Sequence, residues 1–199
     1  MKTLKLACLA LLCTFTVFAQ GYKPGDKAKD FSLKNIDGKM ISLKDYPSAK
    51  GVVVIFTCNH CPFAKMYEDR IVELHKKYAD KGFPVIAINP NDAKTQPEDS
   101  YEMMQKRAKE KSFPFAYVYD ESQEIAKAYG AQRTPHVYVL KKAGNDFTVE
   151  FIGAIDDNAQ DANAAKDKYV EKAIEEILAG KEVTTKTIKA IGCTIKWRS

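Results

Sequence analysis

The stretch of sequence that decides the fold is Val52-Val53-Val54-Ile55-Phe56-Thr57-Cys58-Asn59-His60-Cys61-Pro62. Its first five residues are all apolar, which predicts a strand buried on both faces. Pro62 opens a segment with apolar residues three and four positions apart, which predicts a helix over residues 62–81. Two cysteines separated by two residues therefore lie at a strand-to-helix junction. The unpaired N–H groups of a helix start stabilise a thiolate there, so the stretch predicts a dithiol–disulfide exchange site.

Within this site we expect Cys58 to be the nucleophile and the more exposed sulfur. Cys61 should lie one turn into the helix and resolve the mixed disulfide. Two other interpretations are a metal-binding pair and two inert buried thiols. One Cys-x-x-Cys motif supplies only two ligands, whereas structural zinc needs four. Redox exchange is therefore favoured, and no metal or other cofactor is expected.

The first 19 residues have the pattern of a secretory signal peptide. Basic residues at 2 and 5 precede an apolar stretch over residues 6–18 and a small-residue cleavage site at 17–19. The apolar stretch is shorter than the roughly 20 residues that span a bilayer. We therefore expect an exported, periplasmic protein of residues 20–199 with no membrane span after cleavage.

Cysteine content and charge exclude some classes of function for the expected mature chain. Cleavage would leave Cys58, Cys61 and Cys193, which are too few for a secreted fold held together by disulfides. The whole chain has 31 Lys and Arg against 26 Asp and Glu, and no basic stripe appears. Nucleic acid is therefore not an expected partner. The length fits one domain with its own core.

The remaining pattern predicts an α/β fold in which a central mixed sheet is flanked by helices. An N-terminal β-hairpin is expected over residues 31–43, and Asp120 with Gln123 is typical of a capping box for a short helix that ends near Gly130. Strands are expected at residues 84–89, 116–119, 136–140 and 147–151. Helices are expected at about 97–111 and from Val170 to a stop at Gly180. Strands that alternate with helices and end in a hairpin plus helix are typical of an α/β redoxin.

The chain resembles the thioredoxin-like superfamily. Within it, the likeness is to peroxiredoxin-like redoxins grouped with alkyl hydroperoxide reductase and thiol-specific antioxidant proteins. The matching segments are residues 56–65, 68–70, 134–136, 153–158 and 191–197. Peroxidatic sites of true peroxiredoxins resemble P-x-x-x-T-x-x-C. This chain departs from that pattern because Thr57 lies immediately before Cys58 and four residues before Cys61, and no proline stands four residues before Thr57.

The resemblance implies roles for residues outside the motif. Thr134-Pro135 would be a cis peptide against the cysteines, with backbone groups that bind an extended substrate, although a proline there is also a common turn device. Disulfide-forming enzymes also place histidine just before the second cysteine. That resemblance suggests that His60 lowers the pKa of Cys58 and makes the site more oxidising than thioredoxin; the alternative is an exposed histidine with little effect.

Cys193 has two interpretations of similar weight. It is either a small buried apolar residue or a third redox thiol that exchanges with the Cys58–Cys61 pair. The strand ahead of the motif contains no acid that could accept a proton. Three other candidates, each expected to be a solvated surface carboxylate, are Glu68, Asp156 and Asp157.

The sequence therefore favours an exported thiol–disulfide oxidoreductase. Its expected partners are protein thiols or disulfides, or a thioredoxin-like electron donor. One alternative is a thiol peroxidase that acts on peroxides through a sulfenic acid. A second is a copper-binding redoxin-like chaperone, which would use Cys58, Cys61 and a distal histidine such as His136, a residue otherwise expected to be structural.

Overall fold

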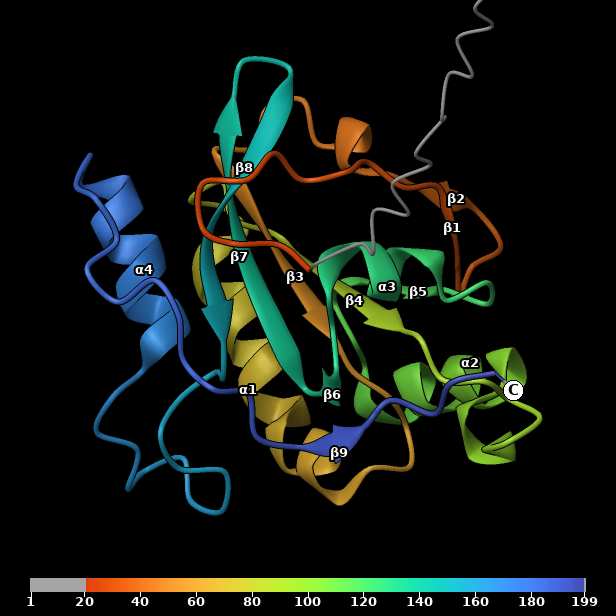
Figure 1. Cartoon of the computed structure of the whole chain (residues 1–199). Coiled ribbons are helices and arrows are strands. Elements are labelled where there is room, and N and C mark those ends of the chain that lie inside the picture. The colour runs from red at the N-terminus through yellow and green to blue at the C-terminus, as the bar shows by residue number, and fades with distance from the viewer. Residues whose placement is uncertain (1–20, 199) are drawn as a thin grey trace, which may run out of the picture.

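The computed structural model describes residues 21–198, and Figure 1 shows them as a twisted β-sheet with helices on both faces. The expected signal peptide, residues 1–19, lies outside the described residues. No helix among the described residues is both long enough and apolar enough to cross a membrane.

The main sheet combines a parallel centre with antiparallel edges. Its strand order is β2 (Met40–Ile41), β1 (Leu33–Asn35), β5 (Ala116–Tyr119), β4 (Val85–Asn89), β3 (Gly51–Phe56), β7 (His136–Ala143) and β8 (Asp146–Gly153). β3, β4 and β5 run parallel, while β7 and β8 form an antiparallel hairpin and β1 pairs antiparallel with both β2 and β5. The expected N-terminal and late hairpins are both confirmed.

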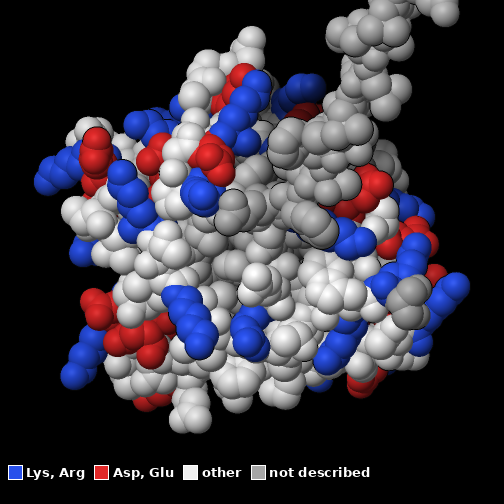
Figure 2. All heavy atoms as spheres, in the orientation of Figure 1, with Lys and Arg blue, Asp and Glu red and all other residues white. Residues whose placement is uncertain are grey.

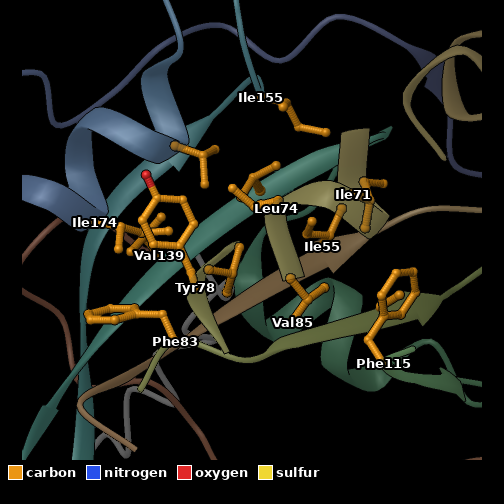
Figure 3. Packing of buried hydrophobic residues seen from close by; sticks show 14 of the residues in the cluster. Ile55, Ile71, Leu74, Tyr78, Phe83, Val85, Phe115, Val139, Ile155 and Ile174 are labelled. Atoms are coloured by element: carbon orange, nitrogen blue, oxygen red, sulfur yellow. The ribbon is translucent and has the colours of Figure 1, made fainter. Parts of the chain in front are cut away.

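Alternating residues of β3 divide the core into two layers. Val53 and Ile55 face the helices α1 (Pro62–Tyr78), α2 (Tyr101–Lys111) and α4 (Tyr169–Leu178). Figure 3 shows part of this layer, where Tyr78 and Leu74 lie over the sheet beside Ile174. The intervening apolar side chains of β3 face α3 (Glu124–Tyr129) and the N-terminal segment. Both faces of β3 are buried, as its continuous apolar run predicts.

Two expected helices have other bounds in the structure. The helix that begins at Pro62 ends at Tyr78 rather than at residue 81. The helix expected over residues 97–111 is divided into a 3-10 turn, η2 (Pro97–Asp99), and α2, because Ser100 adopts an extended backbone and caps α2. A second 3-10 turn, η1, spans Leu43–Asp45.

The capping box at α3 is also wrong. The helix begins at Glu124, and the Asp120 carboxylate reaches past the cap to accept from the N–H of Ala126 at 2.8 Å. The Gln123 side chain instead donates to the carbonyl groups of Pro90 and Lys196 at 2.7 and 2.8 Å. Gln123 therefore fastens the C-terminal segment to the domain.

A second, two-stranded sheet joins distant parts of the chain. β6 (Arg133–Thr134) pairs antiparallel with β9 (Cys193–Thr194), which belongs to the C-terminal segment. In Figure 1 the blue segment leaves α4 and forms β9 beside β6. The chain then ends against the loop after β4 and the start of α3, where Arg198 contacts Asp92 and Gln123. The pairing of β9 with β6 brings this segment to the start of α1, where the cysteine motif lies.

Candidate redox site

Three cysteines meet at the start of α1. Cys61 and Cys193, 132 residues apart, form a disulfide with a Cα–Cα distance of 6.1 Å, and Cys58 is the free cysteine of the described residues. Cys58 and Cys61 are buried in one cluster against which Cys193 packs. The predicted bond between Cys58 and Cys61 is therefore not the one formed here. The structure instead places Cys193 at the site, in the position that a third redox thiol requires.

Cys61 lies at the helix start rather than one turn inside. It is the N-cap residue of α1, with Pro62 at the first helical position, and its carbonyl accepts from the N–H of Lys65 at 3.0 Å. The unpaired N–H groups of the first turn therefore lie closer in sequence to Cys61 than to Cys58. This position favours the thiolate of Cys61 when its disulfide is opened.

Cys58 has an environment that opposes ionisation. Its side chain is 3% exposed, and its Sγ lies 3.2 Å from the Oγ1 of Thr134. Burial first, and the negative charge of Asp99 second, raise the pKa of Cys58 to about 12. The hydrogen bond from Thr134 lowers the pKa by less. The expectation of a lowered pKa for Cys58 is therefore wrong. Cys58 is the more exposed of the two motif cysteines, as expected, but at 3% against 0% for Cys61 both are buried.

His60 does not act on Cys58 as expected because its ring is bound elsewhere. Its Nδ1 lies 2.5 Å from the Oδ2 of Asp99 and 3.7 Å from the Sγ of Cys58. Since the closer partner is the carboxylate, a proton on Nδ1 is directed at Asp99 rather than at the sulfur. The imidazole is mostly buried and is part of a fixed hydrogen-bond network.

Asp99 is the functional residue that the sequence did not reveal. Its carboxylate is fully buried and accepts from the backbone N–H of Asn59 and His60 at 2.7 and 3.1 Å and from Asn91 Nδ2 at 2.7 Å. Those contacts hold the loop between β3 and α1 in place. Asp99 stands 41 positions after Cys58, and only the adjacency of β3 and β4 brings it there. No local pattern in the sequence marks it.

The three expected carboxylates have other roles. Glu68 is buried rather than solvated, and Arg107 donates to both of its oxygens at 2.7 and 2.6 Å. Asp156 is also buried and pairs with Arg70 at 2.7 Å. Asp157 is exposed, as expected. Of these carboxylates and Asp99, only Asp99 accepts hydrogen bonds from the cysteine motif.

The peptide bond between Thr134 and Pro135 is cis, which confirms that prediction. Thr134 contacts both motif cysteines, since its carbonyl oxygen lies 3.3 Å from the Sγ of Cys61 while its hydroxyl contacts Cys58. Its main chain, expected to bind an extended substrate, is paired with Cys193 of β9. The expected substrate position is therefore occupied by the chain itself.

His136 has a structural environment, as expected. Its Nδ1 accepts from the N–H of Gln132 at 3.4 Å, and burial lowers its pKa to about 4. The one group of potential metal ligands found among residues 21–198 is Cys58, His60 and Asp99, whose ligand atoms lie within 4.8 Å of one another. The ligand set expected for copper, with Cys61 and His136, is not assembled.

Charged side chains form no single-sign patch on the face shown in Figure 2, where basic and acidic groups are interspersed. This agrees with the scattered charges of the sequence.

Comparisons with known proteins place this site in context. The model of the AhpC/TSA family matches residues 24–145. The thiol-disulfide oxidoreductase ResA of Bacillus thuringiensis subsp. konkukian (strain 97-27) is 27% identical over 150 residues, covering 70% of this chain and 82% of that protein.

Two solved structures are similar over most of their length. An uncharacterized conserved protein from Geobacillus kaustophilus is 40% identical, with a TM-score of 0.81 over 88% of this chain and 92% of that one. A hypothetical protein from Sinorhizobium meliloti 1021 is 31% identical, with a TM-score of 0.81 over 90% and 97% of the two chains. The expected α/β thioredoxin-like fold and the resemblance to redoxins are confirmed.

Proposed function

The chain belongs to the AhpC/TSA family, and we propose that it is an exported thiol–disulfide oxidoreductase in which three cysteines share one disulfide. The observation that carries the proposal is the Cys61–Cys193 bond, against which the free thiol of Cys58 lies in the same buried cluster. A free thiol beside a disulfide is the arrangement that thiol–disulfide exchange requires. The similarity to a curated thiol-disulfide oxidoreductase supports the same chemistry.

The first step of the proposed reaction is internal. Cys58 loses its proton and attacks the Sγ of Cys61; the Cys61–Cys193 bond breaks as the Cys58–Cys61 bond forms, and Cys193 leaves as a thiolate that takes up a proton. No electrons enter or leave the chain. This step converts the Cys61–Cys193 disulfide of the structure into the Cys58–Cys61 disulfide that the motif predicts.

The second step transfers electrons to or from a partner. In the reducing direction, the dithiol of a thioredoxin-like donor first reduces the Cys58–Cys61 disulfide to two thiols and is itself oxidised to a disulfide. The Cys61 thiolate then attacks a partner disulfide and releases one partner sulfur as a thiolate. Cys58 then attacks Cys61, which releases the second partner thiolate and leaves a Cys58–Cys61 disulfide. We assign the bond with the partner to Cys61 because it lies at the helix start, and the resolving role to Cys58 because its pKa is raised. This reverses the roles expected from sequence.

The raised pKa also changes the expected redox potential. A thiolate that is not stabilised does not favour the dithiol form, so the reason for expecting a strong oxidant is lost.

The test is equilibration of the protein with glutathione buffers, followed by identification of each disulfide by mass spectrometry. We expect Cys61–Cys193 and Cys58–Cys61 to appear as interconverting species and Cys61→Ser to abolish turnover of a protein disulfide. A protein in which Cys61→Ser and wild type reduce the same protein disulfide at equal rates contradicts the proposal.

Export rests on the N-terminal pattern of residues 1–19. We expect the mature protein to start at Gln20 in the periplasmic fraction of a bacterial host, as read by intact mass. A full-length chain retained in the cytoplasm contradicts this part of the proposal.

One observation favours metal binding as a second candidate function. Cys58, His60 and Asp99 offer a thiolate, an imidazole and a carboxylate within 4.8 Å, and the first two suit copper. Tight Cu(I) binding that Cys58→Ser removes and His136→Ala preserves would support this candidate. Equal binding by wild type and Cys58→Ser would exclude it at this site.

A further inference from the structure

The C-terminal strand β9 lies on β6 as an extended peptide would. Cys193 pairs with Thr134 and Thr194 with Arg133, and the ladder continues through the N–H of Ile195, which donates to the Gln132 carbonyl at 3.1 Å. Main-chain pairing of this kind is how an added strand gains affinity for a sheet edge. The thiol of Cys193 is delivered to Cys61 by this pairing.

The approach of β9 to β6 is close enough to require glycine before the cysteine. A Cβ built on Gly192 would lie 2.2 Å from the carbonyl oxygen of Thr134 and 2.7 Å from its carbonyl carbon. Both are backbone atoms, which a side-chain rotation cannot move aside. The Arg133 guanidinium adds a hydrogen bond from Nη1 to the Gly192 carbonyl at 2.9 Å.

A second feature of β9 and the following residues is a buried apolar anchor. Ile195, two positions after Cys193, is 3% exposed and belongs to the core layer on the α3 side of the sheet. Ile191, two positions before Cys193, is 51% exposed. Around the disulfide, the glycine, the cysteine and the apolar residue that follows distinguish this segment by their side chains, whereas Lys196 is held through its backbone N–H and carbonyl groups.

We propose that β9 is an internal occupant of the site at which a partner strand binds, and that this strand must leave β6 before a partner sulfur reaches Cys61. The inference rests on the proposed function and names its partner class. The partner is an extended segment with glycine directly before its cysteine and an apolar residue two positions after it. The Cys61–Cys193 disulfide holds β9 in place.

The disulfide rearrangement described above releases this covalent hold. When Cys58 displaces Cys193 from Cys61, the thiol of Cys193 takes up a proton and β9 is held on β6 by non-covalent contacts alone. A partner strand can then pair with Thr134, and its thiolate can attack Cys61 of the Cys58–Cys61 disulfide, with Cys58 as the leaving thiolate. Electrons and protons balance because each bond formed replaces one broken.

The experiment uses the full chain with Cys58→Ser and Cys193→Ser, in which Cys61 alone remains at the site. The probe is a synthetic copy of residues 189–198 whose cysteine carries glutathione as a mixed disulfide. Attack by Cys61 on the peptide sulfur releases glutathione and traps a Cys61–peptide adduct, which mass spectrometry follows. Adding Gly192→Val should displace β9 and speed adduct formation at least tenfold, whereas the control Ile191→Val should leave the rate unchanged. Equal rates with and without Gly192→Val overturn the proposal.

Peptide variants test the partner class. Alanine in place of the peptide glycine, and aspartate in place of the isoleucine two positions after its cysteine, should each slow the adduct at least tenfold. Equal rates for the three peptides overturn the partner class. Reaction of Cys61 with oxidised glutathione but with none of the peptides overturns the strand site and leaves the proposed function standing.

Hydrogen exchange of backbone amides measures the release of β9 from β6 independently of any disulfide exchange. The backbone amides of residues 193–195 should exchange more slowly in the oxidised wild-type protein than in the reduced wild-type protein. They should exchange fastest in the reduced Gly192→Val variant. Equal protection in the three samples overturns the release of β9, even in a protein that exchanges disulfides. Failure to react with any disulfide, by contrast, overturns the proposed function.

Discussion

The Sγ of Cys58 lies 3.2 Å from the Oγ1 of Thr134, although 76 residues separate the two in sequence. The hydroxyl favours the thiolate of Cys58, whereas burial and the buried carboxylate of Asp99 favour the thiol by a larger amount. The result is a protonated thiol beside a disulfide at neutral pH. Activation of Cys58 therefore depends on how the neighbouring charge is changed or shielded.

The first prediction concerns that charge. Asp99→Asn removes the negative charge and keeps an oxygen that can accept from the N–H groups of Asn59 and His60. The pKa of Cys58 should fall, because a negative charge beside a thiol disfavours the thiolate. Alkylation of Cys58 by iodoacetamide, followed against pH, should become severalfold faster at pH 8–9.

Glu98→Gln is the matched control. Glu98 is the neighbour of Asp99, but its side chain is exposed and it contacts the motif through its backbone carbonyl, which accepts from Asn59. It should leave the alkylation profile unchanged. An unchanged profile for Asp99→Asn as well would show that Asp99 does not set the pKa of Cys58.

The second prediction concerns stability. The Cys61–Cys193 bond closes a loop of 132 residues. Cys193→Ser should lower the free energy of unfolding of the oxidised protein by about 2–5 kcal/mol, because a cross-link restricts the unfolded chain. Urea unfolding with and without reductant measures this difference.

Under reducing conditions wild type and Cys193→Ser should have the same free energy of unfolding, since neither protein then has the cross-link. Cys58→Ser serves as a second control and should retain the Cys61–Cys193 bond. A loss of stability for Cys193→Ser that persists in full under reductant would assign the effect to packing rather than to the disulfide.

The third prediction concerns pH. Burial lowers the pKa of His136 to about 4, below the value of about 6.5 in an unfolded chain. As the pH falls below about 6.5, the unfolded state binds a proton that the folded state does not, so stability is lost progressively down to about pH 4. The expected loss is up to about 3 kcal/mol, reduced because part of the ring reaches solvent.

His136→Phe removes the titrating group and keeps an aromatic ring beside Tyr138. Its free energy of unfolding should depend less on pH between about 4 and 6.5 than that of wild type, as measured by urea unfolding at several pH values. Identical pH profiles for the two proteins would contradict the assignment to His136.

The fourth prediction separates the peroxidase alternative from disulfide exchange. A pKa of about 12 for Cys58 implies a thiolate fraction on the order of a thousandfold below that of free cysteine at neutral pH. Protein that keeps the Cys61–Cys193 bond should therefore form sulfenic acid at Cys58 more slowly than free cysteine does with hydrogen peroxide. Trapping with dimedone and mass spectrometry measures the rate, and a rate well above that of free cysteine would favour a peroxidase.

The sequence by itself determined the main sheet and the place of the cysteine motif. The apolar run over residues 52–56 and the helical spacing after Pro62 are local patterns, and local patterns set strands and helices because burial follows the period of the backbone. The late hairpin, α4 and the cis peptide before Pro135 follow the same patterns or the resemblance that they support.

Only the tertiary structure decided which cysteines are bonded and what surrounds Cys58. The Cys61–Cys193 bond depends on the pairing of β9 with β6, and the contact of Asp99 with the motif depends on the adjacency of β3 and β4. These contacts join residues 132 and about 40 positions apart, so no spacing in the sequence encodes them. The pKa of Cys58 differs from the sequence-based prediction for the same reason, because burial and a distant carboxylate outweigh the local effects of a helix start and a neighbouring histidine.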